Sequence, residues 1–86
     1  MKITNIIKDI RNDITERNIK TIEMFNDELA KMGSEIHVGY DRSENENGHY
    51  IIVGDKDDGY YAGNLEEHPE VVAYKIAERI GWMQDR

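Results

Sequence analysis

Apolar residues recur every three or four positions through the first third of the chain. They are Ile7, Ile10, Ile14, Ile22, Phe25, Leu29 and Met32. This spacing follows the 3.6-residue period of an amphipathic helix, and Asn18 is a polar position within the stripe. A helix over residues 4–32 would be about 43 Å long, which is long for a chain of this size. We therefore expect the helix either to bend or break near residues 15–18, or to project beyond the rest of the domain.

The pattern changes after Gly33, a residue suited to the left-handed position that follows a helix. Three short runs then have the composition of strands, at residues 36–41, 49–54 and 60–65. The second run, from Tyr50 to Val53, is apolar on both faces, which favours the central place in a sheet.

Matching apolar positions between the first two runs predicts their register. We expect Tyr40 to lie opposite Tyr50 and Val38 opposite Ile52, with a loop longer than a two-residue turn between the strands. Asp58-Gly59 closes the second turn.

A second helix is predicted to open at His68-Pro69, since proline suits the first helical position and the helix dipole favours Glu70 in the first turn. Its apolar stripe comprises Val72, Ile76 and Ile80. Gly81 is expected to end it, with Trp82 folding back over the Ala77 turn. The expected architecture is α+β: a long N-terminal helix, a three-stranded antiparallel β-meander and a C-terminal helix, in a single domain over residues 1–86.

Composition narrows the class of protein. The chain has no cysteine, so neither a disulfide nor a thiolate metal site is expected. No apolar run approaches the roughly 18 residues of a membrane span, and no signal peptide is recognised, so we expect a cytoplasmic protein. The net charge of −7 is unevenly distributed: residues 1–33 carry six basic and six acidic residues, whereas residues 34–86 carry five basic and twelve acidic ones. A surface of this sign repels nucleic acid and favours a basic protein partner, and the lack of a long apolar run gives no reason to expect a membrane partner.

Catalytic and metal-binding patterns are not recognised. His37, His49 and His68 lack the spacing of a metal site, and no nucleophile–base arrangement or phosphate-binding loop is present. The run Asp55-Lys56-Asp57-Asp58-Gly59 superficially resembles a calcium loop, but its glycine falls at position five rather than six, which favours a hairpin turn. We expect no enzyme activity and no cofactor.

The acidic loops are the expected partner-binding surface. Carboxylates held on a sheet can imitate the regular phosphate charges of DNA and so occupy the Lys and Arg side chains of a DNA-binding protein. The residues assigned to this surface are Glu44, Glu46, Asn47, Asp55, Asp57, Asp58 and Gly59, with Tyr60 and Tyr61 as aromatic anchors and Trp82 nearby. The alternative interpretation is that the acidic loops only keep the protein soluble.

The chain resembles small phage-encoded inhibitors of bacterial defence, particularly anti-CRISPR proteins that block type II RNA-guided nucleases. The resemblance rests on the opening MKITNIIKDIRN, on the order of helix, three strands and helix, and on the Gly81-Trp82 pair. A fainter likeness to acidic uracil-DNA glycosylase inhibitors lies in IHVGYDRSENENGHYIIVGD. The acidic cluster that follows Gly-Trp in the anti-CRISPR protein has no counterpart here. The resemblance implies an acidic DNA mimic that acts in a host bacterial cell and occupies the nuclease's DNA-binding site.

Two functions therefore stand as expectations. The first is an acidic inhibitor that binds a basic nucleic-acid-binding protein, such as a type II RNA-guided nuclease, without binding nucleic acid itself. The alternative is a self-associating regulatory or accessory protein, in which the long first helix forms a homodimer and a buried Asn18 sets its register.

Overall fold

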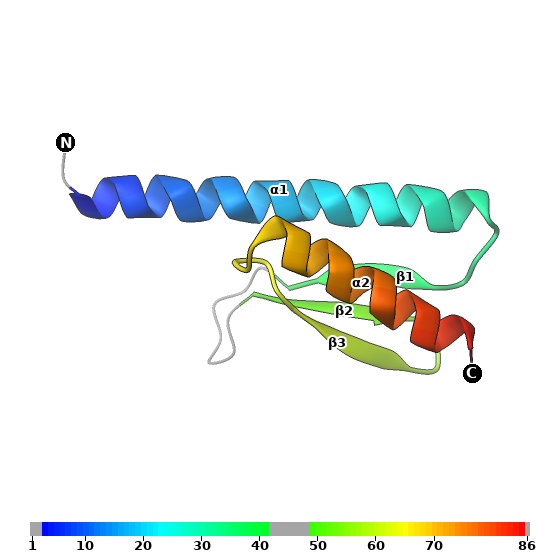
Figure 1. The fold of residues 1–86 in the computed structure, drawn as a ribbon. Helices are drawn as coiled ribbons and strands as arrows, with labels where there is room; N and C mark the ends of the chain where they lie inside the picture. The colour runs from blue at the N-terminus through cyan, green and yellow to red at the C-terminus, as the bar shows by residue number, and fades with distance from the viewer. Residues whose placement is uncertain (1–2, 42–48, 86) are drawn as a thin grey trace.

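The computed structural model describes residues 3–41 and 49–85 and has the predicted α+β architecture. Its elements in chain order are α1 (Ile3–Lys31), β1 (His37–Tyr40), β2 (Tyr50–Gly54), β3 (Gly59–Asn64) and α2 (Pro69–Gln84). The strands form one antiparallel sheet in the order β1-β2-β3, so the central place predicted for the second strand is confirmed. Both helices lie on the same face of this sheet (Figure 1).

The long helix α1 is unbroken, and its N-terminal part projects beyond the sheet and α2 (Figure 1). Of the two expectations for this helix, projection is therefore the correct one. Gly33 ends the helix as predicted: it has φ +67°, and the Gly33 and Ser34 amides donate to the carbonyls of Ala30 and Leu29 at 3.0 Å each. This pair of hydrogen bonds is the Schellman motif.

The hydrophobic core lies between the inner face of the sheet and the two helices. Its buried members are Ile19, Ile22, Leu29, Val38, Ile51, Val53, Ala62, Leu65, Val72, Ile76 and Met83. The only buried polar side chain among the described residues is Asn18, which has no exposed surface. Its amide nitrogen donates to the carbonyls of Leu65 at 2.6 Å and Glu67 at 2.8 Å, so it ties α1 to the turn before α2.

The register between β1 and β2 differs by one residue from the expectation. Val38 lies opposite Val53 rather than Ile52, and Tyr40 lies opposite Ile51 rather than Tyr50. Because neighbouring strand residues point to opposite faces, this register places Val38 with Val53 in the core, whereas Ile52 points to the outer face. The expected register was wrong because β2 is apolar on both faces and therefore offers two equally apolar sets of partners.

The edge of β1 that faces away from β2 is hydrogen-bonded to a side-chain amide of α1. Asn26 Nδ2 donates to the Val38 carbonyl at 2.9 Å, and Asn26 Oδ1 accepts the Val38 amide proton at 2.8 Å. Asn26 therefore makes the two hydrogen bonds that another strand would make to this residue. Edge strands with satisfied backbone groups are poor templates for aggregation.

The second helix begins as predicted but ends later. His68 is the N-cap, its Nδ1 accepts the Glu70 amide proton at 3.3 Å, and Pro69 is the first helical residue. Gly81 does not end the helix, which continues to Gln84. The continuation buries Met83, and this packing outweighs the cost of about 1 kcal/mol for glycine inside a helix. Trp82 does not fold back over the Ala77 turn as expected, because it packs on Tyr60 and Arg79 instead.

Candidate partner-binding face of the sheet

The outer face of the sheet has no helix over it, since both helices cover the opposite face (Figure 1). One cross-strand row on this outer face consists of Gly39, Ile52 and Tyr61. Tyr61 is 53% exposed and Ile52 is half-buried. The next row consists of His37, Gly54 and Gly59. Because the glycines in both rows have no side chain, the centre of this face is a shallow depression. The aromatic side chain of Tyr61 lies at one side of it.

A shallow hollow occupies the part of this face that is nearest the β2–β3 turn. Its floor includes Gly39, Ile52 and Gly54. Its rim includes three carboxylates, together with His37 and Lys56; the carboxylates are those of Glu35, Asp55 and Asp58. Acidic residues therefore lie beside a floor of backbone and aliphatic surface, and His37 and Lys56 share the same hollow. We call this hollow, with Tyr61 beside it, the outer-face site.

The β2–β3 turn is held by its own acidic side chains. Asp55 Oδ1 accepts the amide protons of Asp57 at 2.9 Å and Asp58 at 3.0 Å, and Asp58 Oδ1 accepts that of Gly59 at 2.8 Å. The backbone amide of Asp55 also donates to the Asp58 carbonyl at 2.9 Å. The segment is a hairpin turn, as the glycine position indicated, and two of its three carboxylates stabilise it.

Glycine at position 54 is needed for this turn to close. A Cβ added there would lie 2.6 Å from the Asp58 carbonyl oxygen, which is closer than van der Waals contact allows. The close approach fixes the turn against β2. Asp57 lies at its exposed tip and contributes its amide, rather than its carboxylate, to the turn's hydrogen bonds.

The two acidic loops predicted as one surface leave opposite ends of β2. Asp55 and Asp58 follow its last residue, whereas Asp41 and His49 lie at the other end, where the Asp41 amide donates to the Tyr50 carbonyl at 3.0 Å. Five residues of strand separate these ends by about 14 Å. Glu44, Glu46 and Asn47 themselves lie outside the described residues. At that end, His49 Nδ1 lies 3.2 Å from Glu66 Oε1.

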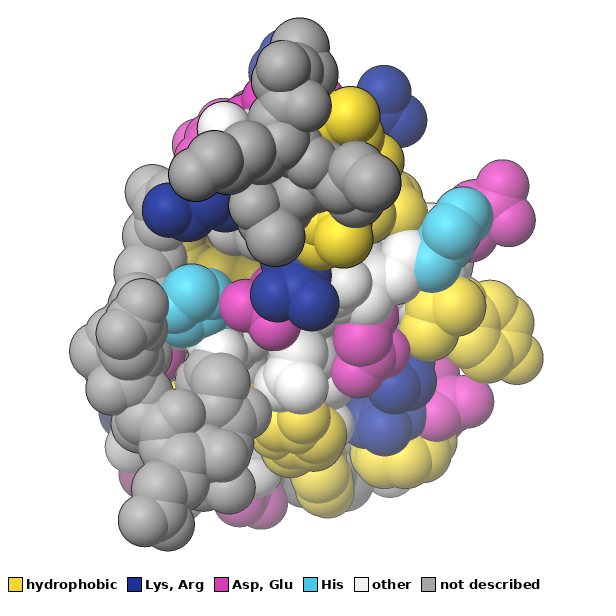
Figure 2. Space-filling model, turned by 90° about the vertical axis from the view of Figure 1, so that its left-hand side faces the viewer, with side chains coloured by type: hydrophobic (Ala, Val, Ile, Leu, Met, Phe, Trp, Pro, Cys, Tyr) yellow, Lys and Arg dark blue, Asp and Glu magenta, His cyan; other side chains and the backbone are white. Residues whose placement is uncertain are grey.

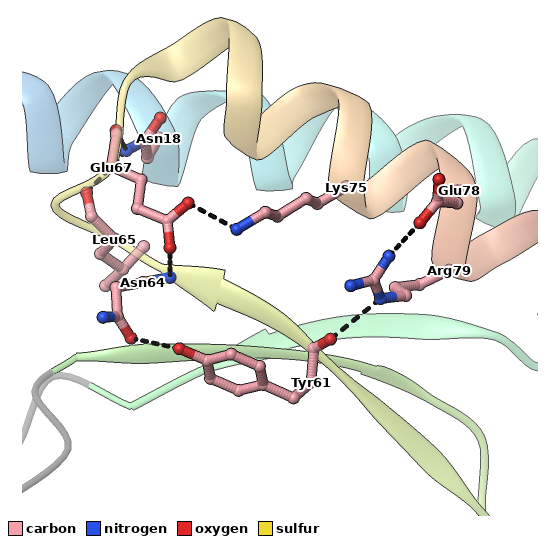
Figure 3. Close-up of polar contacts among 8 residues, drawn as sticks. All are labelled: Asn18, Tyr61, Asn64, Leu65, Glu67, Lys75, Glu78 and Arg79. Carbon is pink, nitrogen blue, oxygen red and sulfur yellow. Dashed lines mark hydrogen bonds and ion pairs between the residues drawn. The ribbon is translucent and has the colours of Figure 1, made fainter.

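The two adjacent tyrosines point to opposite faces of the sheet, as the sequence predicted. Tyr60 is half-buried on the helix side, where its ring meets Trp82 edge to face at 5.5 Å between centroids. Tyr61 points outward, and its hydroxyl donates to Asn64 Oδ1 at 2.9 Å (Figure 3). A partner on the outer face would therefore contact Tyr61, with Gly59 beside it, and would not reach the ring of Tyr60.

A network of polar contacts fixes β3 to α2 behind the outer-face site (Figure 3). Arg79 stacks over Trp82 at 4.3 Å from the ring centroid, donates from Nε to the Tyr61 carbonyl at 3.0 Å and pairs with Glu78. These contacts hold the backbone of Tyr61 in place. A partner that uses this tyrosine would therefore lose little side-chain or backbone freedom on binding.

Glu67 links the end of β3 to the middle of α2. Its carboxylate accepts the Asn64 amide proton at 3.2 Å and pairs with Lys75 at 2.8 Å (Figure 3). Gly63 makes room for it, because a Cβ at that position would lie 2.9 Å from Glu67 Oε1, and Gly63 has φ +94°. The sequence did not predict this link between β3 and α2, and it did not predict that Glu35 and His37 line the hollow. The correct strand register would have placed His37 beside Gly54 and so beside the turn.

No three His, Asp or Glu side chains converge as metal ligands anywhere in residues 3–41 and 49–85. Within the same ranges, neither helix combines the length and apolar character that crossing a membrane requires. Comparison with protein-family models, with curated proteins and with solved structures finds no significant match to this chain.

Proposed function

We propose that this protein is an inhibitor that binds a basic, nucleic-acid-handling protein through the outer face of its sheet. The observation that carries the proposal is a sheet face that neither α1 nor α2 covers, with an oriented, exposed Tyr61 beside a hollow lined by Glu35, Asp55 and Asp58. Because both helices lie on the other face of the sheet, this face is a natural docking surface. Aromatic anchors beside charged groups are typical of the strongest contacts in protein interfaces.

The charge of the chain supports a basic partner. All of the net charge of −7 comes from residues 34–86, which contain the sheet and α2. A surface with this sign speeds association with a positively charged groove and disfavours DNA and RNA as direct ligands. The proposed mechanism is competitive: an Arg or Lys that normally holds a phosphate or a base edge enters the hollow and pairs with its carboxylates.

The first target to test is a guide-loaded type II RNA-guided nuclease, because the opening of the chain and its element order resemble inhibitors of that class. The protein would be immobilised and the nuclease captured at about 0.1 M and about 0.5 M salt, with and without target DNA. Capture that weakens with salt and is displaced by target DNA is the expected result, since salt screens charge pairs at a surface. Capture that target DNA does not displace would contradict the competitive mechanism.

Asp57→Lys tests the surface beside the outer-face site, because Asp57 does not line the hollow but lies in the turn between Asp55 and Asp58, which do. Asp57 is exposed, and the turn uses its amide rather than its carboxylate, so the fold should be unchanged. Affinity for the target should fall by about tenfold or more, because a carboxylate is replaced by a repelling ammonium. Glu23→Lys, an equal charge change on the exposed side of α1, is the matched control and should leave affinity nearly unchanged. Equal effects of the two variants would show that net charge, not the outer-face site, determines binding.

A further inference from the structure

The projecting part of α1 carries an apolar face that nothing in the described structure covers. We call residues 3–14 the overhang. In it, Ile6, Ile7 and Ile10 are 44%, 47% and 54% exposed, whereas Ile22, further along the same helix, is 1% exposed. Figure 2, which looks onto the end from which α1 projects, shows hydrophobic side chains at the surface there. Three large aliphatic side chains exposed within five residues form a contiguous patch, unlike the isolated apolar residues of an ordinary surface.

A second apolar surface lies on the body of the same helix. It is a groove between α1 and α2, lined by Thr21, Met24, Phe25, Glu28 and Ala73. Met24, on its α1 side, is 67% exposed. The groove is thus bordered by apolar side chains on both helices, and it lies on the outer side of the helical layer rather than on the sheet.

The overhang and the groove belong to one stripe of α1. Counting from Ile7 in alternating steps of three and four leads through Ile10, Ile14, Arg17 and Thr21 to Met24 and Glu28. Residues at these steps share one helix face in the seven-residue repeat that two packed helices use. An apolar partner helix that follows this face would therefore cover the overhang at one end and the groove at the other.

We propose that the occupant of this face is a second copy of the chain, with the two α1 helices antiparallel and the overhang of each copy in the groove of the other. In this register Ile7 lies opposite Met24 of the second copy, and Ile10 lies opposite Thr21 of the second copy. Because the contact is symmetric, both copies cover their overhangs and their grooves at once. A different protein bound at one overhang would leave the groove open.

The charges of α1 favour the same register. Asp13 and Lys20 flank the stripe on one side, one before and one after its midpoint. The antiparallel register that matches the apolar residues also places Asp13 opposite Lys20 of the second copy, and this pair occurs twice across the two-fold axis. Arg17 stays beside its own Asp13, at 3.1 Å. The register that pairs Ile7 with Met24 of the second copy therefore also pairs opposite charges, and it places Ile14 opposite Arg17 of the second copy at the centre of the contact.

Asn18 does not set the register of this pairing. It has no exposed surface, and its amide nitrogen donates to two carbonyls of its own chain. The self-association anticipated from the sequence would therefore depend on Asp13 and Lys20 rather than on a buried asparagine.

The test is sedimentation equilibrium of the purified protein and of two charge-reversal variants. The experiment uses no inhibited target, so a negative result would count against the dimer and not against the proposed function. The unaltered chain should form a dimer. Asp13→Lys and Lys20→Asp should each raise the dimer dissociation constant by about tenfold or more, because each creates two like-charge contacts. An equimolar mixture of the two variants should form a heterodimer, and the double variant should regain the homodimer, because opposite charges then face each other again.

Ile10→Glu tests the apolar part of the same contact. The side chain is exposed in the single copy, so the variant should fold normally by circular dichroism yet sediment as a monomer. Asn12→Glu, on the other side of the overhang, is the matched control and should remain dimeric. A chain that is monomeric at every concentration would overturn the proposal. So would a dimer that Ile10→Glu leaves intact, or single charge variants that do not recover when mixed.

Discussion

At the scale of single residues, two asparagine side chains on α1 make the hydrogen bonds that backbone groups would otherwise make. Asn26 satisfies both backbone groups of Val38 at the edge of the sheet, and Asn18 satisfies two carbonyls in the turn before α2. The sequence marked Asn18 as a polar interruption of an apolar stripe but could not identify its partners, because they lie 47 and 49 residues away. Long-range polar pairing leaves no periodic signal in a single sequence.

The role of Asn18 is tested by Asn18→Asp, which keeps the shape of the side chain and replaces its donor with a carboxylate oxygen. That oxygen would face the carbonyl oxygens of Leu65 and Glu67 in a buried site. We expect the free energy of unfolding in urea to fall by about 2–4 kcal/mol, since two buried hydrogen bonds are lost and a charge is buried. Asn12→Asp, exposed on the same helix, should change it by less than about 0.5 kcal/mol. Equal losses would contradict the role given to Asn18.

At the scale of elements, repeating patterns predicted what local geometry controls and missed what packing controls. The 3.6-residue period gave α1, and Gly33 and Pro69 marked helix boundaries that the structure confirms. The prediction that Gly81 ends α2 was wrong, because it took account of the low helix propensity of glycine but not of the packing of Met83 and Trp82 beyond it. The predicted register between β1 and β2 was wrong for a similar reason, because only contact with the helices distinguishes the two apolar faces of β2.

Replacing the two helix-related glycines with alanine should have opposite effects. A Cβ at Gly81 or at Gly33 meets no atom within 4 Å, so the two sites differ in backbone conformation rather than in space. Gly81→Ala should raise the free energy of unfolding by about 0.5–1 kcal/mol, because it lies inside α2. Gly33→Ala should lower it by about 1 kcal/mol, because φ is +67° there. Thermal unfolding of both variants beside the unaltered chain gives the signs, and a stabilised Gly33→Ala would contradict the Schellman ending of α1.

At the scale of the whole molecule, the sequence shows where the acidic residues lie along the chain but not where they lie in space. The acidic residues do concentrate in the second part of the chain, yet the two loops that carry them leave opposite ends of β2. The hollow on the outer face combines Glu35, which precedes the sheet, with the turn after β2. Such a combination depends on strand register, which the sequence did not determine.

The projection of α1 gives a further expectation for the molecule as a whole. A helical segment of about a dozen residues without tertiary packing is only marginally stable in water, so the overhang of a single copy should open readily. In the proposed dimer the same segment is packed on a second copy. Amide hydrogen exchange over residues 5–13 should therefore slow as protein concentration rises, while exchange in β2 stays the same.

Ile10→Glu supplies the comparison for this experiment. Its overhang should exchange rapidly at every concentration, because the variant cannot bury the stripe against a second copy. Rapid exchange that is independent of concentration in the unaltered chain would mean that the overhang stays uncovered, and the dimer would be excluded. Slow exchange in both chains would mean that the overhang is stable alone, and its exposed isoleucines would then need another explanation.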